Sequence, residues 1–328
     1  MTQRPAARVY RPTPRNIALL ASRLRAGELV AVPTETVYGL AANALDARAC
    51  RQIFRAKNRP ANDPLIVHVY ALKDLELLCH PNEAALLLAK HFWPGPLTLV
   101  LPKTGLIPAI VTSGGSSVAI RIPQHPVFRH LLKQTGLPLA APSANPFGYI
   151  SPTTAEHVRE NLGGKISHIL DGGHSRIGLE STIVDLRDPS SPRLLRPGAV
   201  SAQEIAWVLG RPVSVVKKAA SSRGKGLIAP GMLHRHYSPR TPVVLHDVIE
   251  TLGGKDEAFI FMRKPAGPKP SNVFWLDDRG RLTGVARRLF STLRKVDAQG
   301  FRQIHVETAS GDPLADAIND RLRRAAAR

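Results

Sequence analysis

The feature that most constrains the fold is the interleaving of short apolar segments with amphipathic segments over the first two thirds of the chain. The amphipathic segments carry helix start and stop signals: Thr13 precedes an apolar periodic run that ends at Gly27, and Asp46 precedes the next run. The apolar segments, such as LVAV at 29–32 and PLIVHV at 64–69, have the length of strands. Because strands and helices mix without strict alternation, the pattern predicts an α/β or α+β domain with a mixed sheet.

The sequence divides into three parts. We expect a mixed α/β domain over residues 1–210 and a linker over residues 211–240, which are rich in Ser, Gly, Lys and Pro and lack periodicity. Residues 241–328 carry strand and helix patterns typical of a small Rossmann-like α/β domain. This last part contains no GxGxxG, so dinucleotide binding is not indicated. The string PGMLHRHYSP at 230–239 is too specific for a passive tether, which suggests a functional role for the linker.

The net charge indicates which kinds of partner the protein could bind, and the cysteines indicate whether a zinc site or disulfides are expected. The 45 Lys and Arg residues against 25 Asp and Glu residues give a formal net charge of +20, which favours anionic partners such as nucleotides or RNA. Arginines on solvated faces would explain the same charge equally well. The two cysteines, Cys50 and Cys79, lack metal-ligand spacing and indicate neither a zinc site nor a disulfide framework. With no secretory signal and no apolar run that could span a membrane, the sequence predicts a cytoplasmic protein without a membrane partner.

Several polar clusters come directly after apolar strands, where ligands bind in open α/β sheets. Thr34, Glu35 and Thr36 follow the first of these strands and could hydrogen-bond a small polar ligand, although a capped turn would use the same residue types. Lys57 and Arg59 lie at the end of a predicted helix, before a proline-rich stretch. Two cations on a stiff loop suit phosphate oxygens, and cationic capping of a helix C-terminus is the alternative.

Three further clusters follow later strands. Arg121 lies inside the apolar string VAIRIP and needs a partner if it is buried, either a ligand carboxylate or a structural Asp or Glu. Ser143 and Asn145 lie in a turn at a strand end, and Ser151 is expected to cap the next helix, whose N-terminus would attract an anion. Two short strings, GLESTIVDL and LLRPGAVS, contribute further hydroxyls and another arginine.

The clusters together do not indicate covalent catalysis. The chain has no Ser-His-Asp pattern, no GxxxxGK[ST] and no HExxH, and we predict no protein metal ligands. Hydroxyls, amides and a few cations around a cleft suit the binding of a small zwitterion beside a polyphosphate. The chemistry would then come from positioning and charge neutralisation. Mg²⁺ is expected as the companion of the nucleotide, held mainly by the phosphates.

Seven strings of the sequence occur together in the order of a known family. They are PTETVYGLAANA, KNRPANDPLIVHV, FWPGPLTLVL, VAIRIP, APSANPFG, LDGG and the pair GLESTIVDL…LLRPGAVS. In this order they resemble the YrdC-like domain of threonylcarbamoyl-AMP synthases, and APGMLHRHYSP followed by an α/β module resembles the long, two-domain form. The resemblance implies a twisted mixed sheet that lines a basic concave cleft. It also implies an enzyme, a nucleotidyltransferase that makes threonylcarbamoyl-AMP and pyrophosphate from L-threonine, bicarbonate and ATP. Other proteins would then transfer the threonylcarbamoyl group to tRNAs reading ANN codons.

The resemblance also assigns roles to residues of this chain. The threonine-binding residues it implies are Thr36, His68, Arg121, Ala141 (through its backbone) and Ser181, with Thr34 and Glu35 shaping the pocket. The ATP-binding residues it implies are Arg59, Asp63, Ser117, Ser143, Asn145, Ser151, Arg196 and Tyr237. Lys57 and Arg59 would neutralise charge that develops during the reaction, and Tyr237 would close over the nucleotide as part of a lid. Asp63 departs from the family, which commonly has Asn at this position, and a carboxylate near a triphosphate would repel it.

Two other interpretations remain at this point. A YrdC-like protein could bind RNA without synthesising an adenylate, and weak RNA binding would fit the net charge. Aromatic residues make up only 5% of the chain, so base stacking would be poorly supplied. Hydrogenase maturation carbamoyltransferases also contain a YrdC-like domain, but they carry zinc-finger cysteines and an acylphosphatase-like domain that this sequence lacks.

Overall fold

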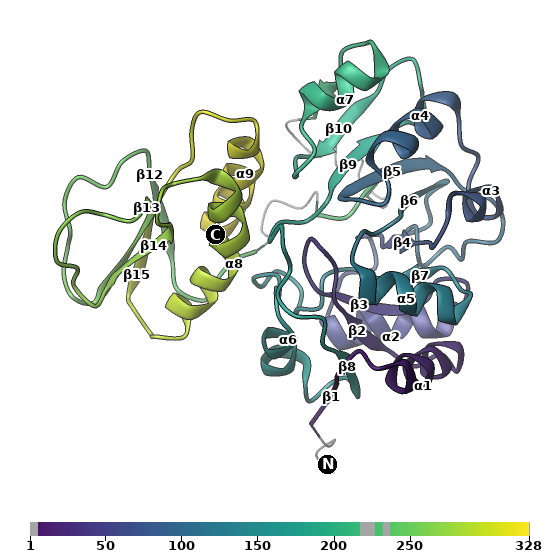
Figure 1. The fold of residues 1–328 in the computed structure, drawn as a ribbon, viewed down its shortest axis with the longest axis horizontal. Helices are drawn as coiled ribbons and strands as arrows, with labels where there is room; N and C mark the ends of the chain where they lie inside the picture. Colours follow the sequence, from purple (N-terminus) through teal and green to yellow (C-terminus); the bar gives the residue numbers. More distant parts are fainter. Residues whose placement is uncertain (1–5, 217–226, 232–236, 328) are drawn as a thin grey trace.

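The computed structural model describes residues 6–216, 227–231 and 237–327. It has a large domain built on one mixed sheet and a C-terminal domain built on a small parallel sheet (Figure 1). Both parts of the predicted fold class are therefore confirmed. No helix in the described ranges is long and apolar enough to cross a membrane.

The large sheet has the order β1-β8-β2-β3-β7-β4-β6-β5-β9-β10-β11 and contains parallel and antiparallel pairs. Its strands are β1 (Arg8–Tyr10), β2 (Val30–Val32), β3 (Gly39–Asn43), β4 (Ile66–His68), β5 (Leu97–Pro102), β6 (Ser117–Arg121), β7 (Leu139–Ala140), β8 (His168–Leu170), β9 (Thr182–Asp185), β10 (Arg193–Arg196) and β11 (Ser214–Val215). Sequence patterns did not predict β1, β3 or β11. β3 follows the hydroxyl-rich turn at once, so the chain returns into the sheet before the helix that Asp46 caps.

Helices cover the two faces of this sheet unequally. The helices are α1 (Pro14–Arg25), α2 (Ala47–Lys57), α3 (Leu75–Leu78), α4 (Glu83–Phe92), α5 (Pro126–Thr135), α6 (Ala155–Leu162) and α7 (Ala202–Leu209), with a short 3₁₀ turn, η1 (Leu72–Asp74). Apolar side chains of α2, α4, α6 and α7 pack with Ala31, Val67, Leu99 and other residues of one sheet face. Those of α1 and α5 pack with Val30 and Val32 on the opposite face. Adjacent residues of β2 therefore pack in the cores on opposite faces of the sheet, because side chains alternate between the two faces along a strand.

On the face that carries α1 and α5, the middle strands lack a helical cover. There Ile66, Val100 and Ala119 pack instead with Ala229 and its neighbours 227–228. This segment belongs to the part of the chain predicted as a linker, whose positions 217–226 and 232–236 lie outside the described residues. A short loop segment, rather than a helix, therefore covers this part of the sheet.

The C-terminal domain is a parallel sheet with helices toward the large domain. Its elements are β12 (Val243–His246), β13 (Glu257–Arg263), β14 (Val273–Asp277), α8 (Leu282–Asp297), β15 (Gln303–Glu307) and α9 (Leu314–Ala326), with the strand order β12-β15-β13-β14. α8 and α9 lie between this sheet and the large domain (Figure 1). Gly178 of the large domain has a φ of +81°, and a Cβ there would lie 2.5 Å from the Ala286 carbonyl oxygen of α8. Glycine therefore permits the close approach of the two domains.

One predicted helix start needs correction. Thr154, rather than Ser151, caps α6, because its side chain accepts a hydrogen bond from the His157 backbone N–H at 3.2 Å. Ser151 lies outside the helix, is fully buried and donates its hydroxyl to Glu180 instead.

Candidate active site

A hollow of about 510 Å³ empty volume lies on the open face of the large sheet. Nine residues that the resemblance singled out line it: Thr36, Arg59, His68, Arg121, Ala141, Ser143, Ser181, Arg196 and Tyr237. They come from the loop after β2, from strands β4, β6 and β10, from segments that follow α2, β7 and β8, and from the linker. The fold thus brings residues that are up to 201 positions apart into one concavity, from Thr36 to Tyr237.

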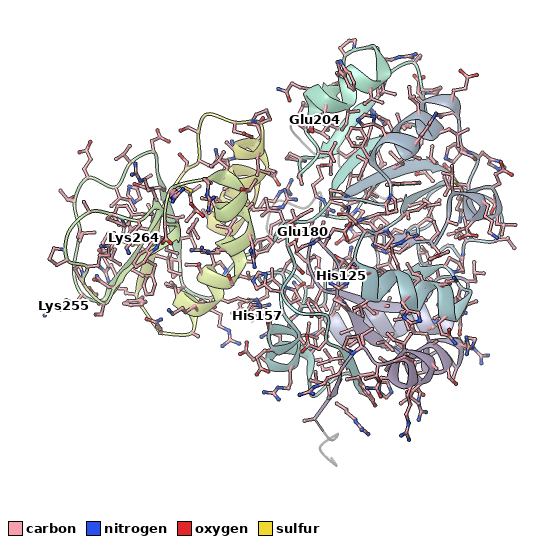
Figure 2. The ribbon with its side chains drawn as sticks, in the orientation of Figure 1. His125, His157, Glu180, Glu204, Lys255 and Lys264 are labelled. Atoms are coloured by element: carbon pink, nitrogen blue, oxygen red, sulfur yellow. The ribbon has the colours of Figure 1, made fainter. Side chains whose placement is uncertain are left out.

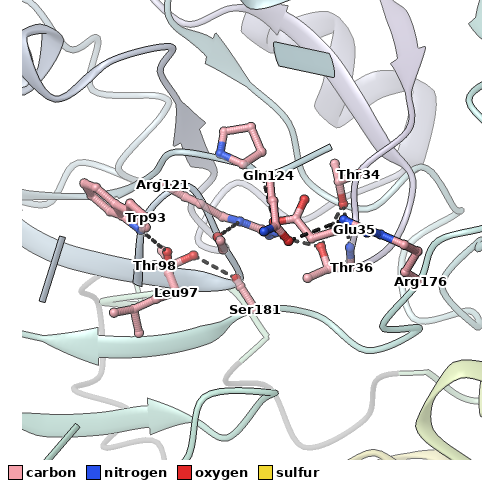
Figure 3. Close-up of polar contacts among 12 residues, drawn as sticks. Thr34, Glu35, Thr36, Trp93, Leu97, Thr98, Arg121, Gln124, Arg176 and Ser181 are labelled. Carbon is pink, nitrogen blue, oxygen red and sulfur yellow. Dashed lines mark hydrogen bonds and ion pairs between the residues drawn. The ribbon is translucent and has the colours of Figure 1, made fainter. Parts of the chain in front are cut away.

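The floor of the hollow is a row of polar side chains on neighbouring strands. His68 of β4 stands opposite Arg121 of β6 in the strand register. Thr98 of β5 continues the row, and its hydroxyl oxygen lies 2.7 Å from that of Ser181, which precedes β9 (Figure 3). Side chains at these positions point to the face opposite the α2 and α4 core because each alternates with a residue of that core.

Arg121 is the most constrained side chain of this row. Its Nη2 lies 2.6 Å from Glu35 Oε1, its Nη1 donates to the Thr36 hydroxyl at 3.0 Å, and its Nε donates to the Gly95 carbonyl oxygen at 3.0 Å (Figure 3). The guanidinium is 3% exposed. The sequence left open whether a structural acid or a ligand carboxylate pairs with Arg121, and the structure shows that Glu35 does so.

Glu35 is buried as an ionised group. Burial opposes its ionisation, but the Arg121 guanidinium and the Gln124 backbone N–H hold the pKa of Glu35 below its usual value. Its second oxygen, Oε2, has no hydrogen-bond partner among the residues that the structure describes.

The turn after β2 is tied together by the Thr34 hydroxyl. This hydroxyl accepts hydrogen bonds from the backbone N–H groups of Thr36 and Val37, at 3.1 and 3.2 Å, and donates to the Val37 carbonyl oxygen at 2.6 Å. Its oxygen also lies 2.8 Å from the Thr36 hydroxyl oxygen. Thr34 thereby sets the direction of Thr36, which reaches Arg121.

His68 is a neutral imidazole in the wall of the hollow. Burial and the nearby Arg121 charge lower the pKa of His68 to about 3. The ring packs against Phe128 of α5, with centroids 5.4 Å apart, and its Nδ1 has no hydrogen-bond partner within the described ranges. A buried nitrogen without a partner costs free energy unless a ligand or water satisfies it.

Three cations cluster at another part of the hollow. Arg59 lies 2.9 Å from Asp63 Oδ2 and donates to the Asp63 and Pro64 carbonyl oxygens at 2.9 and 2.7 Å. Arg196 donates to the carbonyl oxygen and hydroxyl of Ser181, at 3.0 and 3.1 Å. Lys57 is 1% exposed and donates to the carbonyl oxygens of Ser143 and Asn145, at 2.6 and 2.5 Å.

The cations outnumber the acids around the hollow. Lys57, Arg59, Arg121 and Arg196 carry positive charge, against the three carboxylates of Glu35, Asp63 and Glu180 on the same domain. Burial raises the pKa of Asp63, although Arg59 and Lys57 oppose that change, and burial together with Arg59 lowers the pKa of Lys57. Such a low-dielectric, electropositive hollow favours an anionic ligand.

Five predicted site residues do not line the hollow: Lys57, Asp63, Ser117, Asn145 and Ser151. Lys57 supports the Ser143 loop from behind, and Asp63 neutralises Arg59. Asn145 bonds through its amide to the Pro146 and Tyr149 carbonyl oxygens, at 2.9 and 2.8 Å. The pairing of Asp63 with Arg59 shows how a carboxylate is accommodated beside an anion-binding hollow.

Two lining residues bring the C-terminal domain into contact with the hollow. Tyr237 is 1% exposed, has the unusual φ of +63° for a residue with a side chain, and stacks on Phe290 of α8 with centroids 5.4 Å apart. Glu180, which sequence patterns did not single out, lies where the two domains meet (Figure 2). The sequence signal that could have identified Glu180 is its position directly before Ser181 in GLESTIVDL. The residue of the C-terminal domain that pairs with Glu180, described below, has no such sequence signal.

Metal-binding residues are not concentrated here or elsewhere in the described chain, where no group of three or more His, Cys, Asp or Glu side chains could hold a metal ion. Both cysteines are buried as free thiols.

Comparisons with known proteins agree with this geometry. Residues 22–198 match a family model described as Telomere recombination, and residues 200–327 match one described as Threonylcarbamoyl-AMP synthase, C-terminal domain. A threonylcarbamoyl-AMP synthase of Pyrococcus abyssi is 43% identical, with 94% of this chain and 93% of the relative covered. One of Bacillus subtilis is 41% identical, with 94% and 92% covered.

A solved structure shows the same fold. It is described as P. abyssi Sua5 complexed with L-threonine and superimposes with a TM-score of 0.87 at 39% identity, with 97% of this chain and 96% of that chain covered. Together with the two family models, these relatives show that the chain belongs to the two-domain threonylcarbamoyl-AMP synthase family and is an adenylyl-transferring enzyme.

Proposed function

We propose that the hollow seats L-threonine beside ATP and joins them through bicarbonate to form threonylcarbamoyl-AMP and pyrophosphate. The observation that carries this proposal is the arrangement of one concavity. Arg121, the neutral His68 and the hydroxyls of Thr36 and Ser181 gather on one part of it, and the cations Arg59 and Arg196 line another. The relative described as complexed with L-threonine supports the choice of amino acid.

The threonine carboxylate would bind Arg121. A guanidinium has five N–H donors, and the bonds to Gly95, Thr36 and Glu35 use three of them. Two donors are left for a ligand carboxylate, so threonine can bind without displacing Glu35. His68 Nδ1, Ser181 and the Ala141 backbone then face the remaining polar groups of the amino acid.

The triphosphate would bind the cationic part of the hollow. Arg59 and Arg196 are placed to contact phosphate oxygens directly, and Lys57 adds its charge from behind the Ser143 loop. We propose that Ser143 and Tyr237 contact the nucleotide, while Asp63, Ser117 and Ser151 support the wall from outside the lining. Asn145, two residues after Ser143, would act on the nucleotide through the Mg²⁺ ion.

The reaction then follows from placement. Bicarbonate and a proton yield CO₂ and water. The threonine nitrogen, once deprotonated to the neutral amine, attacks the carbon of this CO₂, one C–O π pair moves onto oxygen, and the nitrogen releases a proton to solvent, so that a carbamate forms. A carbamate oxygen attacks the α-phosphorus of ATP, the bond from that phosphorus to the bridging oxygen breaks, and pyrophosphate leaves. Lys57, Arg59 and Arg196 stabilise the charge that develops on phosphate oxygens. Holding the two reactants next to each other supplies much of the acceleration.

Mg²⁺ is the cofactor we propose, arriving with the nucleotide. Asn145 Oδ1 is a buried oxygen without a hydrogen-bond partner in the described parts of the chain, and oxygen is the donor type that Mg²⁺ prefers. With few such oxygens available, the phosphates would supply most of the ligands. When bound, the ion neutralises phosphate charge.

The linker and the C-terminal domain would shield the reaction. We propose the boundaries 1–210, 211–240 and 241–328, with the linker closing the hollow through Pro230, Gly231 and Tyr237, all of which line it. Exclusion of water would protect an adenylate that hydrolyses readily. We also propose that the enzyme works in the cytoplasm, that transfer proteins carry the product to tRNA, and that any direct RNA contact is weak.

Pyrophosphate release tests the function. Purified protein is incubated with ATP, bicarbonate and Mg²⁺, and with L-threonine, L-valine or no amino acid, while pyrophosphate and the adenylate are followed. We expect pyrophosphate only when threonine and bicarbonate are both present, and its loss on chelation of Mg²⁺. Pyrophosphate release that is indifferent to threonine, or none at all, would contradict the proposal.

A further inference from the structure

A buried arginine of the C-terminal domain contacts a carboxylate in the wall of the hollow. Arg321 of α9 is fully buried, and its Nε lies 2.9 Å from Glu180 Oε2, while its Nη2 donates to the Glu180 carbonyl oxygen at 3.3 Å. The second carboxylate oxygen of Glu180 accepts a hydrogen bond from Ser151 at 2.5 Å. Both oxygens of this lining residue are therefore held in place, one of them from the other domain.

Arg321 also fixes the surroundings of Glu180. Its Nη1 donates to the Pro197 carbonyl oxygen and to Asp320 Oδ2, each at 2.9 Å. Its guanidinium carbon lies 5.4 Å from the ring centroid of Tyr237, a lining residue near the end of the linker. One side chain of α9 thus contacts two lining residues, Glu180 and Tyr237, and the residue directly after Arg196.

Glu180 would conflict with nucleotide binding if it were free. It lines the same hollow as Arg196, and Arg196 is bonded to Ser181, the residue after Glu180. Burial and the nearby Arg321 guanidinium lower the pKa of Arg196, and the Glu180 carboxylate acts in the opposite direction, so this carboxylate lies within electrostatic range of Arg196. A freed carboxylate would pair with Arg196 and repel phosphate oxygens.

We propose that Arg321 is a positioning residue for nucleotide binding: it holds the Glu180 carboxylate against the C-terminal domain, so that Arg196 is free to bind the triphosphate. This inference rests on the proposed function, because it takes the ligand of Arg196 to be ATP. Through Arg321 the C-terminal domain then shapes the nucleotide site, although Arg321 itself does not touch the nucleotide.

A matched control separates this role from general support of the domain interface. Arg294 of α8 is a second buried arginine that crosses to the large domain, where it bonds to the carbonyl oxygens of Ile150 and Ser151 and to Asn161. None of these three acceptors lines the hollow. Arg294→Met therefore removes a comparable buried contact and leaves the Arg321–Glu180 pair intact. It acts on the backbone of Ser151, whose hydroxyl donates to Glu180, and not on the Glu180 carboxylate itself.

The test uses the full chain in four forms: wild type, Arg321→Met, Arg294→Met and Arg321→Met with Glu180→Gln. Calorimetric titration gives the Kd for ATP, turnover gives KM for ATP and for threonine, and thermal unfolding gives stability. We expect Arg321→Met to raise the Kd and KM for ATP about tenfold or more, which corresponds to about 1.4 kcal/mol. KM for threonine should change far less. Asp320 keeps a partner in this variant, because Arg324 Nε lies 3.0 Å from both of its oxygens.

The double variant tests whether the freed Glu180 carboxylate causes the loss of ATP affinity. Since Gln carries no charge to pair with Arg196, adding Glu180→Gln should return the ATP Kd to within about threefold of wild type. Arg294→Met should lower stability and leave the ATP Kd within about threefold. Equal ATP affinities for the two single variants, or no recovery in the double variant, would overturn the inference.

A replacement variant and the wild-type control allow each outcome of the test to be assigned. If Arg321→Met does not fold, Arg321→Gln replaces it. Its neutral amide holds the Glu180 carboxylate less firmly than the guanidinium does, so the Kd for ATP should still rise, by about threefold or more. Failure of the wild type to bind ATP or to release pyrophosphate would instead overturn the proposed function. An active wild type with an unchanged Arg321→Met Kd overturns only the role of Arg321.

Discussion

Replacing Arg121 with methionine should separate threonine binding from ATP binding. The Arg121–Glu35 pair is buried, with side chains 3% and 1% exposed. Removing one partner of such a pair costs about 3–5 kcal/mol of folding stability, because the other charge is left unpaired. At about 2–4 °C per kcal/mol for a domain of this size, the melting temperature should fall by roughly 6–20 °C.

The effect on threonine follows from the same geometry. A charge-assisted contact between a buried guanidinium and a ligand carboxylate is worth about 2–5 kcal/mol when one side is truncated. At about 1.4 kcal/mol per decade, KM for threonine should rise by roughly 30-fold to several thousand-fold. The Kd for ATP should stay within about threefold, because Arg59 and Arg196 are unchanged.

A second variant distinguishes lost binding from lost stability. In Arg121→Met with Glu35→Gln no unpaired charge remains, so much of the stability should return, but threonine binding should not. Thermal unfolding, ATP titration and threonine-dependent pyrophosphate release measure the three quantities. If the double variant kept the wild-type KM for threonine, Arg121 would have no part in binding the amino acid.

Three further predictions concern other parts of the hollow. Arg196→Met should raise KM for ATP by about 30-fold and leave KM for threonine within about threefold. This is the reverse of the effect expected for Arg121→Met. Parallel changes in both KM values would refute separate binding regions for threonine and ATP. The pKa of His68 is about 3 in the folded protein and about 6.5 when unfolded, so the unfolded chain binds more protons between these values. The stability due to neutral His68 is complete above pH 6.5 and is lost progressively as pH falls toward 3, with a slope of up to about 1.4 kcal/mol per pH unit. His68→Gln should remove this slope in denaturant unfolding at pH 6.5 to 4, and curves that fall in parallel would show that His68 titrates normally. A chain that ends at Val216 lacks Ala229, which is fully buried, and Tyr237, which lines the hollow, so pyrophosphate release should drop at least about tenfold. Normal turnover of that truncated chain would reduce the linker to a tether.

Local signals predicted most of the fold. Thr13 and Asp46 cap helices as expected, and apolar strings such as those at 97–102 and 257–263 form strands. The missed strands are short or lack β-branched residues: β1 has three residues, β11 has two exposed residues, and β3 is the alanine-rich string GLAAN. Such segments become strands because neighbouring strands offer hydrogen bonds, which depends on tertiary structure rather than on propensity.

The site was predictable as a set of residues but not as a set of contacts. The resemblance named nine residues that line the hollow, but it could not say that Glu35 pairs with Arg121 or Asp63 with Arg59. Pairing depends on side-chain directions that a linear pattern does not contain. Glu180 and Arg321 lie 141 positions apart, and neither carries a local signal for the other.

We propose that one electropositive hollow holds threonine next to ATP, so that placement drives the reaction. A crystal structure with threonine, bicarbonate and a non-hydrolysable ATP analogue tests this most directly. The threonine carboxylate should contact Arg121, and the phosphates should contact Arg59 and Arg196. If the carbamate has formed, its attacking oxygen should lie about 3–3.5 Å from the α-phosphorus. If it has not, the threonine nitrogen should lie within a few ångströms of that phosphorus. Threonine and nucleotide bound in separate sites, or a hollow that stays empty at saturating ligand, would contradict the claim.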